Sequence, residues 1–244
     1  MPEEEAVLSV EDEEEKPRWT LVHGKDLLIG MAILWAVELL LGLGMILWVG
    51  DASNLEQHPV AILMTILISA PVTLLVCWFF VCKKYGKSLS SGFLIGRPNR
   101  KNLVVAGAIG IVYGLVAVVL MVLFSTGQSM FGKMAESTTG LLCVSIIALL
   151  VPVIEEVYYR GFLFPVFQNK WGSRVAVIIV TLWFGGVHVF QNTEDLMAVP
   201  VIFVLSLIMT LQRCITKSLT PCIITHWTYN FTMVIASVLS ALMT

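Results

Sequence analysis

The chain has 244 residues, of which 57% are hydrophobic and 13% are charged, and its formal net charge is −2 at pH 7. Soluble domains usually carry about 25% charged residues, so this composition excludes an ordinary water-soluble globule. It also excludes an intrinsically disordered chain, which needs low hydrophobicity and high net charge. Apolar blocks of about 20 residues predict an all-α, polytopic transmembrane helical bundle, with the lipid bilayer as its surroundings. No nucleic-acid partner is expected.

The N-terminus is acidic: eight of the 17 acidic residues lie within the first 15 positions, and no Lys or Arg precedes Lys16. Such a run of like charges predicts a solvated, disordered tail, which we place at residues 1–20. The tail is either a linker without a chemical role or a segment with a regulatory or docking role. The five cysteines contain no CxxC pair, so they predict neither a disulfide framework nor a cysteine-based zinc site.

The apolar blocks predict seven membrane spans, which we place at 27–49, 60–82, 103–125, 141–164, 174–190, 196–212 and 221–242. Loops that are rich in Lys and Arg alternate with loops that are poor in them. The loop at 83–101 contains six such residues, and Arg213 and Lys217 precede the last span. This alternation predicts a cytoplasmic N-terminus and a C-terminus on the far side. An eighth helix remains open, either as a split span or as an interfacial piece in 84–102.

We therefore divide the membrane part into N-terminal transmembrane helices, 21–140, and C-terminal transmembrane helices, 141–244. The six cations of loop 83–101 either set the topology by contact with anionic headgroups or recruit substrate. In the third span, Gly110 and Gly114 form a small-xxx-small pair, which predicts close packing against another helix.

Ionisable residues at membrane depth are costly and are functional candidates by default. The predicted spans contain six of them: Glu38, Glu155, Glu156, Arg160, His188 and His226. Five of the six fall in the fourth, fifth and seventh spans. Glu38 stands alone in the first span, and we interpret it as a packing or cavity carboxylate outside the site.

The fourth span holds two adjacent carboxylates. Glu156 and Arg160 are four residues apart, so one helical face carries both and they can neutralise each other. Glu155 points elsewhere, and a desolvated carboxylate without a cation is a candidate general base. Pro152 removes a helix hydrogen bond one turn earlier and is expected to open the backbone there. Alternatively, Glu156 and Arg160 form a buried ion pair with a purely structural role.

The fifth and seventh spans each carry a histidine with an i, i+4 partner, Phe184 with His188 and His226 with Asn230. Alone, either histidine is more often a hydrogen-bonded packing residue. The fourth and fifth spans are predicted to form an antiparallel hairpin that turns near Trp171-Gly172. Residues 155 and 188 are equidistant from this turn, so Glu155 and His188 are expected at similar depth, which strengthens the prediction of a joint site. His226 reaches the same depth only if the hairpin protrudes about 10 Å beyond the other helices or if the helices tilt strongly.

These motifs, Glu155-Glu156-x-x-x-Arg160, Phe184-x-x-x-His188 and His226-x-x-x-Asn230, resemble those of the CPBP intramembrane endopeptidases. This family includes type II CAAX prenyl endopeptidases, bacteriocin-processing proteins and Abi-like proteins, and the resemblance covers about 145–235. It implies hydrolysis of a peptide bond by activated water, in a prenylated or otherwise hydrophobic peptide or protein. It also implies a multi-pass protein, expected in a bacterial cytoplasmic membrane with the active site open to the cytoplasm.

The resemblance also implies roles for the motif residues. Glu155 takes a proton from water with the assistance of His188, while His226 and Asn230 donate to the oxyanion. The expected supporting residues, which orient these groups, are Glu156, Arg160 and Phe184.

No cofactor is certain from the sequence. The alternative to a metal-free mechanism is a zinc ion held by Glu155, His188 and His226, because two histidines and a carboxylate are a known zinc set. The spacing lacks the compact HExxH pattern of many zinc proteases, which favours the metal-free hypothesis.

Two other functions compete with proteolysis. A membrane transporter or proton relay also needs intramembrane carboxylates and histidines, but it more often shows repeat symmetry between halves. Here those residues gather in one half. A catalytically silent immunity or scaffold protein of the same fold would lose motif residues, and all of them are present.

Overall fold

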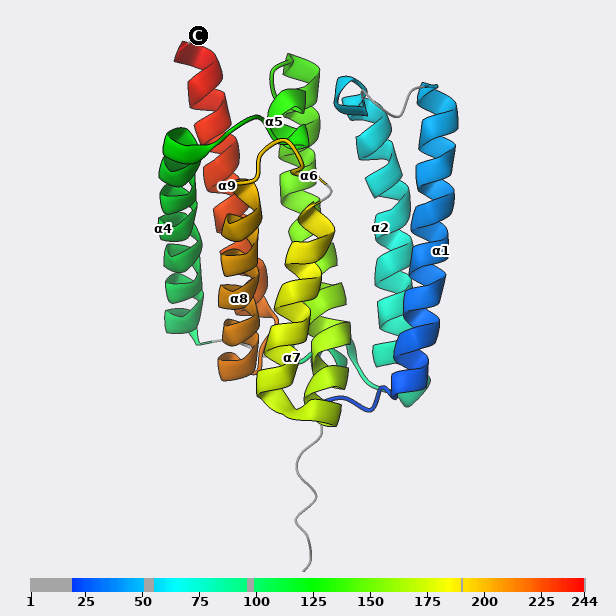
Figure 1. The fold of residues 1–244 in the computed structure, drawn as a ribbon. Helices are drawn as coiled ribbons and strands as arrows, with labels where there is room; N and C mark the ends of the chain where they lie inside the picture. The colour runs from blue at the N-terminus through cyan, green and yellow to red at the C-terminus, as the bar shows by residue number, and fades with distance from the viewer. Residues whose placement is uncertain (1–18, 51–54, 96–98, 190, 244) are drawn as a thin grey trace, which may run out of the picture.

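The structure is a computed structural model that describes residues 19–50, 55–95, 99–189 and 191–243. Every regular element in these residues is helical, and the described chain contains no strand, so the predicted all-α fold is confirmed. Six apolar helices are long enough to cross a membrane, and the fourth of them, Thr138–Val189, doubles back on itself. The described chain therefore makes seven passes along the bundle (Figure 1).

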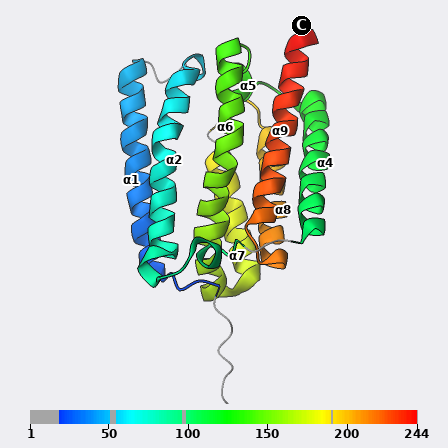
Figure 2. The same cartoon turned by 180° about the vertical axis from the view of Figure 1, so that it is seen from behind.

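The helices stand side by side as one bundle. The first two, α1 (Gly24–Val49) and α2 (Pro59–Val81), form one edge, and α4 (Arg100–Phe124) forms the other. Both views show this arrangement (Figures 1 and 2). Shorter segments join them: η1 (Leu55–Gln57), η2 (Lys83–Tyr85), α3 (Leu89–Gly92) and α5 (Met130–Met134). The described chain enters the bundle at the end where α7 (Phe164–Val189) reverses its direction, and it leaves the bundle at the opposite end (Figure 1). An odd number of passes requires this.

The centre of the bundle is a helical hairpin. Its descending limb consists of α6 (Thr138–Glu156), the π-helical η3 (Val157–Leu163) and the start of α7 (Phe164–Val189). The chain reverses at Gly172, whose φ of 78° favours glycine, and this reversal confirms the predicted turn. Figure 1 shows the tip of the hairpin extending beyond the nearby ends of α4 and α8 (Ala198–Thr216). This is the direction of the protrusion predicted from the depths of Glu155, His188 and His226.

The predicted opening of the helix at Pro152 is wrong. Pro152 lies inside α6, and α-helix continues past it to Glu156. The irregular backbone begins one residue later, at the π-helix. The helix therefore tolerates the hydrogen bond lost at Pro152 and changes its register directly after the two glutamates.

The last helix, α9 (Thr220–Met243), packs closely against α4. A Cβ atom at Gly110 would lie 2.0 Å from the hydroxyl oxygen of Thr228, and one at Gly114 would lie 2.8 Å from Cβ of Thr232. Only glycine leaves room for this approach, so the predicted close packing of the small-xxx-small pair is confirmed. This contact fixes the helix that carries His226.

The segment before α1 is attached to the tip of the hairpin. The backbone N–H of Trp19 donates to Oδ1 of Asn169 at 2.8 Å, and Nδ2 of Asn169 donates to the carbonyl of Thr20 at 2.7 Å. Trp19 also meets Phe164 edge to face, with ring centroids 5.6 Å apart. The predicted acidic tail, 1–20, lies outside the described residues except for these last two positions, which are packed.

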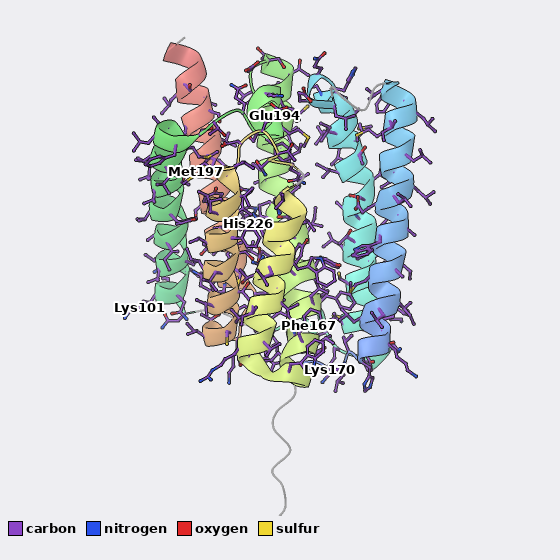
Figure 3. All side chains as sticks on the ribbon, in the orientation of Figure 1. Lys101, Phe167, Lys170, Glu194, Met197 and His226 are labelled. Carbon is purple, nitrogen blue, oxygen red and sulfur yellow. The ribbon has the colours of Figure 1, made fainter. Side chains whose placement is uncertain are left out.

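The two ends of the bundle differ in their polar residues. Lys101 and Lys170 lie at the end that carries the hairpin tip, and Glu194 lies at the opposite end (Figure 3). There, Lys133 forms an ion pair of 2.7 Å with Glu194, and this hydrogen-bonded pair raises the pKa of Lys133. The structure thus places the predicted basic loop and the hairpin tip on the same side.

Candidate active site

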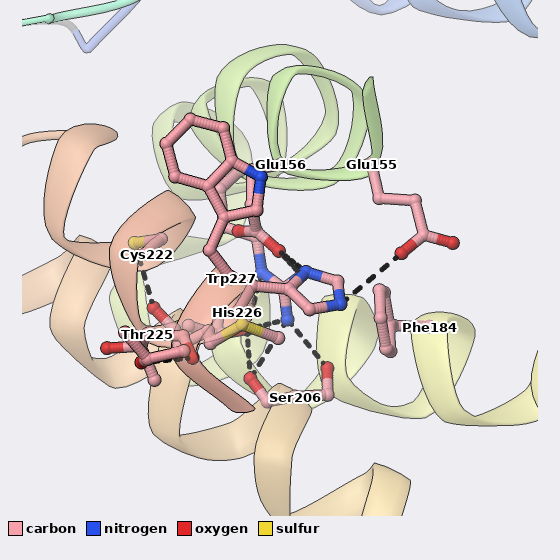
Figure 4. Close-up of polar contacts among 12 residues, drawn as sticks. Glu155, Glu156, Phe184, Ser206, Cys222, Thr225, His226 and Trp227 are labelled. Atoms are coloured by element: carbon pink, nitrogen blue, oxygen red, sulfur yellow. Dashed lines mark hydrogen bonds and ion pairs between the residues drawn. The ribbon is translucent and has the colours of Figure 1, made fainter. Parts of the chain in front are cut away.

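Three of the predicted catalytic side chains meet within the bundle. Oε1 of Glu155, on α6, lies 3.7 Å from Nε2 of His188, on α7. Oε2 of the same carboxylate lies 3.7 Å from Nε2 of His226, on α9. Figure 4 shows the ring of His226 between the carboxylates of Glu155 and Glu156. Each oxygen of Glu155 therefore faces a different histidine, which agrees with the depth predicted from the hairpin.

The second nitrogen of each histidine fixes the orientation of its ring. Nδ1 of His188 lies 2.7 Å from the carbonyl oxygen of Phe184, which can only accept, so this Nδ1 carries a proton. Nδ1 of His226 lies 3.0 Å from Oε1 of Glu156, and the same reasoning assigns a proton to it. Both rings consequently present Nε2 to Glu155. The contact between His226 and Glu156 was not predicted from the sequence.

The predicted ion pair of Glu156 and Arg160 is present and completely buried. Nη1 of Arg160 donates to Oε1 of Glu156 at 2.8 Å, and both side chains are 0% exposed. Its Nη2 donates to Oγ of Ser206 at 2.8 Å, and its Nε donates to Oγ1 of Thr210 at 3.2 Å. The guanidinium thus ties α6 to α8 and holds Glu156 beneath His226.

Sequence reasoning missed the part that α8 plays in this network. Ser206, Thr210 and Arg213 are spaced i, i+4 and i+7, so they form a polar stripe on one face of an apolar helix. That spacing is the signal that would have revealed them. The interpretation of Arg213 as a loop cation is wrong, because it lies within α8 and its side chain is 0% exposed.

Arg213 supplies a donor that the π-helix lacks. In η3 the N–H of Phe164 bonds to the carbonyl of Tyr159, five residues back. In the same register the carbonyl of Arg160 would face Pro165, which has no N–H. Nε of Arg213 donates to this carbonyl at 3.0 Å and satisfies it. A buried carbonyl without a donor is costly, so Arg213 stabilises the irregular backbone directly below the glutamates.

Phe184 occupies the space between the ionic network and the histidines. Its side chain is 1% exposed and stacks on the ring of His188, with centroids 4.5 Å apart. On the same ring, Cζ of Arg160 lies 4.7 Å from the centroid, within cation–π range. Phe184 therefore packs His188 against the buried guanidinium, which is the arrangement expected of a supporting residue.

A cavity of about 520 Å³ opens beside these residues. Its walls come from α1, α2 and α6 to α9, and apolar side chains form most of them. The predicted site residues on its surface are Glu155, Phe184, His188, His226 and Asn230. Asn230 lies one turn beyond His226 on α9, so both side chains reach the same space. Glu38, which we expected to lie outside the site, is also on the wall of this cavity.

The residues as placed do not form a metal site. Among the described residues no group of three or more His, Cys, Asp or Glu side chains is positioned to hold a metal ion. The two Nε2 atoms approach separate oxygens of one carboxylate.

The comparison with protein families agrees with the motifs. Residues 136–232 match the family model described as Type II CAAX prenyl endopeptidase Rce1-like. This part of the chain is similar to the Rce1-like family. The comparisons with curated proteins and with solved structures found no match. The Rce1-like region contains all three motifs and the polar stripe of α8, whereas α1 and α2 lie outside it. The apolar helices and this match support an integral membrane protein that is similar to the intramembrane CAAX-type endopeptidases in general.

Proposed function

We propose that the protein hydrolyses a peptide bond in a lipidated or otherwise hydrophobic peptide, using water activated by Glu155. The observation that carries this proposal is the position of Glu155, whose two oxygens face two histidines on the wall of an apolar cavity. A carboxylate at this depth is expensive in a membrane, and no Lys or Arg of the described chain forms an ion pair with it. A role as general base accounts for a carboxylate at this position.

In the proposed reaction the oxygen of water bonds to the carbonyl carbon while one proton passes to Glu155. The C–N bond then breaks, and Glu155 returns that proton to the departing amine nitrogen. His188 supports the transfer through Nε2, which faces Oε1 of Glu155, because its Nδ1 is already used on the backbone. General acid–base catalysis of this kind typically contributes about 10²–10⁴-fold in rate.

His226 and Asn230 are proposed to stabilise the oxyanion. To donate through Nε2 while Nδ1 donates to Glu156, His226 must carry both protons. The ring lies between the carboxylates of Glu155 and Glu156, so each N–H of an imidazolium has an acceptor before substrate binds. Asn230 adds a neutral donor from the next turn of α9. Removing one such donor costs about 10²–10³-fold in rate in studied enzymes.

The proposed orientation places the hairpin tip in the cytoplasm of a bacterial cell, because the described cations of loop 83–101, such as Lys101, lie at that end (Figure 3). The cavity then lies within the membrane, and its apolar walls suit a prenyl or acyl chain. A lipidated substrate enters laterally between helices, and a leader peptide enters from the water side. Both routes lead to the same carboxylate.

The test is a cleavage assay on membranes that contain the wild-type chain or Glu155→Gln, His188→Ala or His226→Ala, with a panel of lipidated and leader peptides. All three variants are expected to lose at least about 10²-fold in turnover. Glu136→Gln is the matched control, because it removes an exposed carboxylate outside the cavity. Wild-type turnover in all three variants would refute the site. A wild-type chain that cleaves none of the peptides would favour a non-catalytic scaffold.

The same preparations test the metal. Activity that survives chelation, in purified protein without bound zinc, is the expected result. Activity that is lost on chelation and restored by zinc would instead favour the set of Glu155, His188 and His226 as metal ligands.

A further inference from the structure

Glu38 is a second carboxylate on the cavity that holds the candidate active site. It projects from α1, outside the Rce1-like region, and its side chain is exposed on the cavity wall. Ser69 and Thr73, on α2, line the same wall. They form a small polar patch on a wall whose other α1 and α2 residues, including Leu34 and Trp35, are mostly apolar.

Glu38 differs from the other carboxylates of the helices in what it contacts. Asp26 is held by Lys84 and Tyr85. Glu156 has Arg160, and Glu155 has two histidines. Within the described part of the chain, the neighbour found for Glu38 is the hydroxyl of Ser69, and no cation lies beside it.

A carboxylate at membrane depth is costly unless it is paired, and such residues usually serve a ligand or an ion pathway. A packing role is poorly served here, because the side chain faces an open cavity and no cation of the described residues neutralises it. The partner that satisfies Glu38 must therefore enter the cavity from outside. A group with a positive charge and N–H donors fits a carboxylate best.

We propose that Glu38, together with Ser69, is a specificity subsite that binds a basic side chain of the peptide substrate. This inference rests on the proposed function, and it names the class of peptide that the site prefers. With the scissile bond at Glu155, the substrate backbone and Glu38 share one cavity. A lysine side chain suits a mostly apolar cavity with a carboxylate on its wall, because its methylene stem packs on apolar walls while its ammonium pairs with the carboxylate.

The experiment uses matched lipidated peptides that carry lysine or norleucine at a single position, scanned over the three residues on each side of the cleaved bond. Norleucine has a similar length and lacks the ammonium. At one of these positions the wild-type protein is expected to prefer lysine by about tenfold or more in kcat/KM, the size expected for a charge-assisted hydrogen bond. Glu38→Gln is expected to reduce this ratio to near one, and Ser69→Ala to reduce it partly. Glu136→Gln, the carboxylate control, is expected to keep it.

Two further measurements separate the possible failures. Peptide affinity is measured by fluorescence anisotropy on the Glu155→Gln protein in lipid nanodiscs, with and without Glu38→Gln, so the subsite is tested without hydrolysis. If Glu155→Gln cleaves like the wild type, the proposed function fails while the affinity ratio still reports on Glu38. Thermal unfolding of Glu38→Gln shows whether the variant folds.

The subsite is refuted if lysine gives no preference in the wild type at any scanned position. It is also refuted if folded Glu38→Gln keeps the wild-type ratio of lysine to norleucine within about twofold in both assays. A lower melting temperature with an unchanged ratio would assign Glu38 to packing and overturn the proposal as well.

Discussion

Replacing Glu156 by Ala is expected to destabilise the protein by about 3–5 kcal/mol, because it strips a buried guanidinium of its counter-charge. Arg160 would keep hydrogen bonds to the hydroxyls of Ser206 and Thr210, but both partners are neutral. The side chain is 0% exposed, so no water can replace the lost carboxylate. The upper part of the range is therefore expected.

The double change Glu156→Leu with Arg160→Met separates stability from activity. Replacing a buried ion pair by apolar residues of similar volume is often neutral or stabilising, so the double variant should recover most of the loss. Its turnover should nevertheless fall by about 10²-fold or more, as for loss of an oxyanion donor. The reason is that Nδ1 of His226 loses its acceptor, and Phe184 loses the cation beneath its ring.

The assay pairs reversible unfolding in detergent micelles with peptide cleavage on the same preparations. A loss below about 1 kcal/mol for Glu156→Ala would refute the claim that the pair is desolvated. A double variant that is as unstable as Glu156→Ala would refute the compensation. A stable and fully active double variant would refute the positioning of His226.

Three further predictions concern the scaffold. Arg213→Met leaves a carbonyl of η3 without its donor, so a loss of about 1–3 kcal/mol in unfolding free energy is expected in chemical denaturation. Gly110→Ala should lower the melting temperature, because the new Cβ would lie 2.0 Å from a threonine hydroxyl of α9. Gly107→Ala, whose nearest neighbour is 3.8 Å away, should be nearly neutral. The pair with Glu194 raises the pKa of Lys133, so the stability that this pair adds over Lys133→Gln should be present at neutral pH. It should begin to fall above the ordinary lysine pKa of about 10.5 and disappear as the pH rises through the raised value, which unfolding from about pH 7 to about pH 12 would show. A constant difference across that range would contradict the pairing.

The helices could be predicted from the sequence because the bilayer imposes their length and because local signals end them. Gly172 turns the central hairpin with a positive φ, and a Thr220-Pro221 start opens α9. Within one helix, i, i+4 spacing correctly predicted the pair of Glu156 and Arg160. Equal distance from the turn placed Glu155 level with His188, and their contact at 3.7 Å agrees with that.

What the sequence did not reveal depends on how each helix is rotated about its axis. The contact of His226 with Glu156 requires that α9 turn one face toward α6, and no spacing within a single helix determines that rotation. The network on α8 was missed because Ser206 and Thr210 are ordinary residues in an apolar helix until a partner from another helix reaches them. Arg213 was assigned to a loop because a cation near a span boundary usually lies there.

The irregular backbone lies after Glu156 and not at Pro152, and a contact between helices explains this position. Pro152 costs α6 one hydrogen bond, and the helix absorbs it. Pro165 acts at a distance, because in the π register it leaves the carbonyl of Arg160 without a donor. That buried carbonyl needs a hydrogen-bond donor from another helix, and Nε of Arg213 supplies it. The irregular segment is therefore determined by a tertiary contact, which proline positions alone cannot predict.

The charges within the bundle fall into two groups with different consequences. Arg160 and Arg213 are completely buried, and their partners inside the protein are a carboxylate, two hydroxyls and backbone carbonyls. Glu155 and Glu38 instead lie on the wall of one cavity. Groups that are already satisfied cannot pair with a substrate without breaking the fold. Because Glu155 and Glu38 can take up a new partner at no such cost, we propose these two carboxylates, with the histidines beside Glu155, as the source of the chemistry and the selectivity of the site.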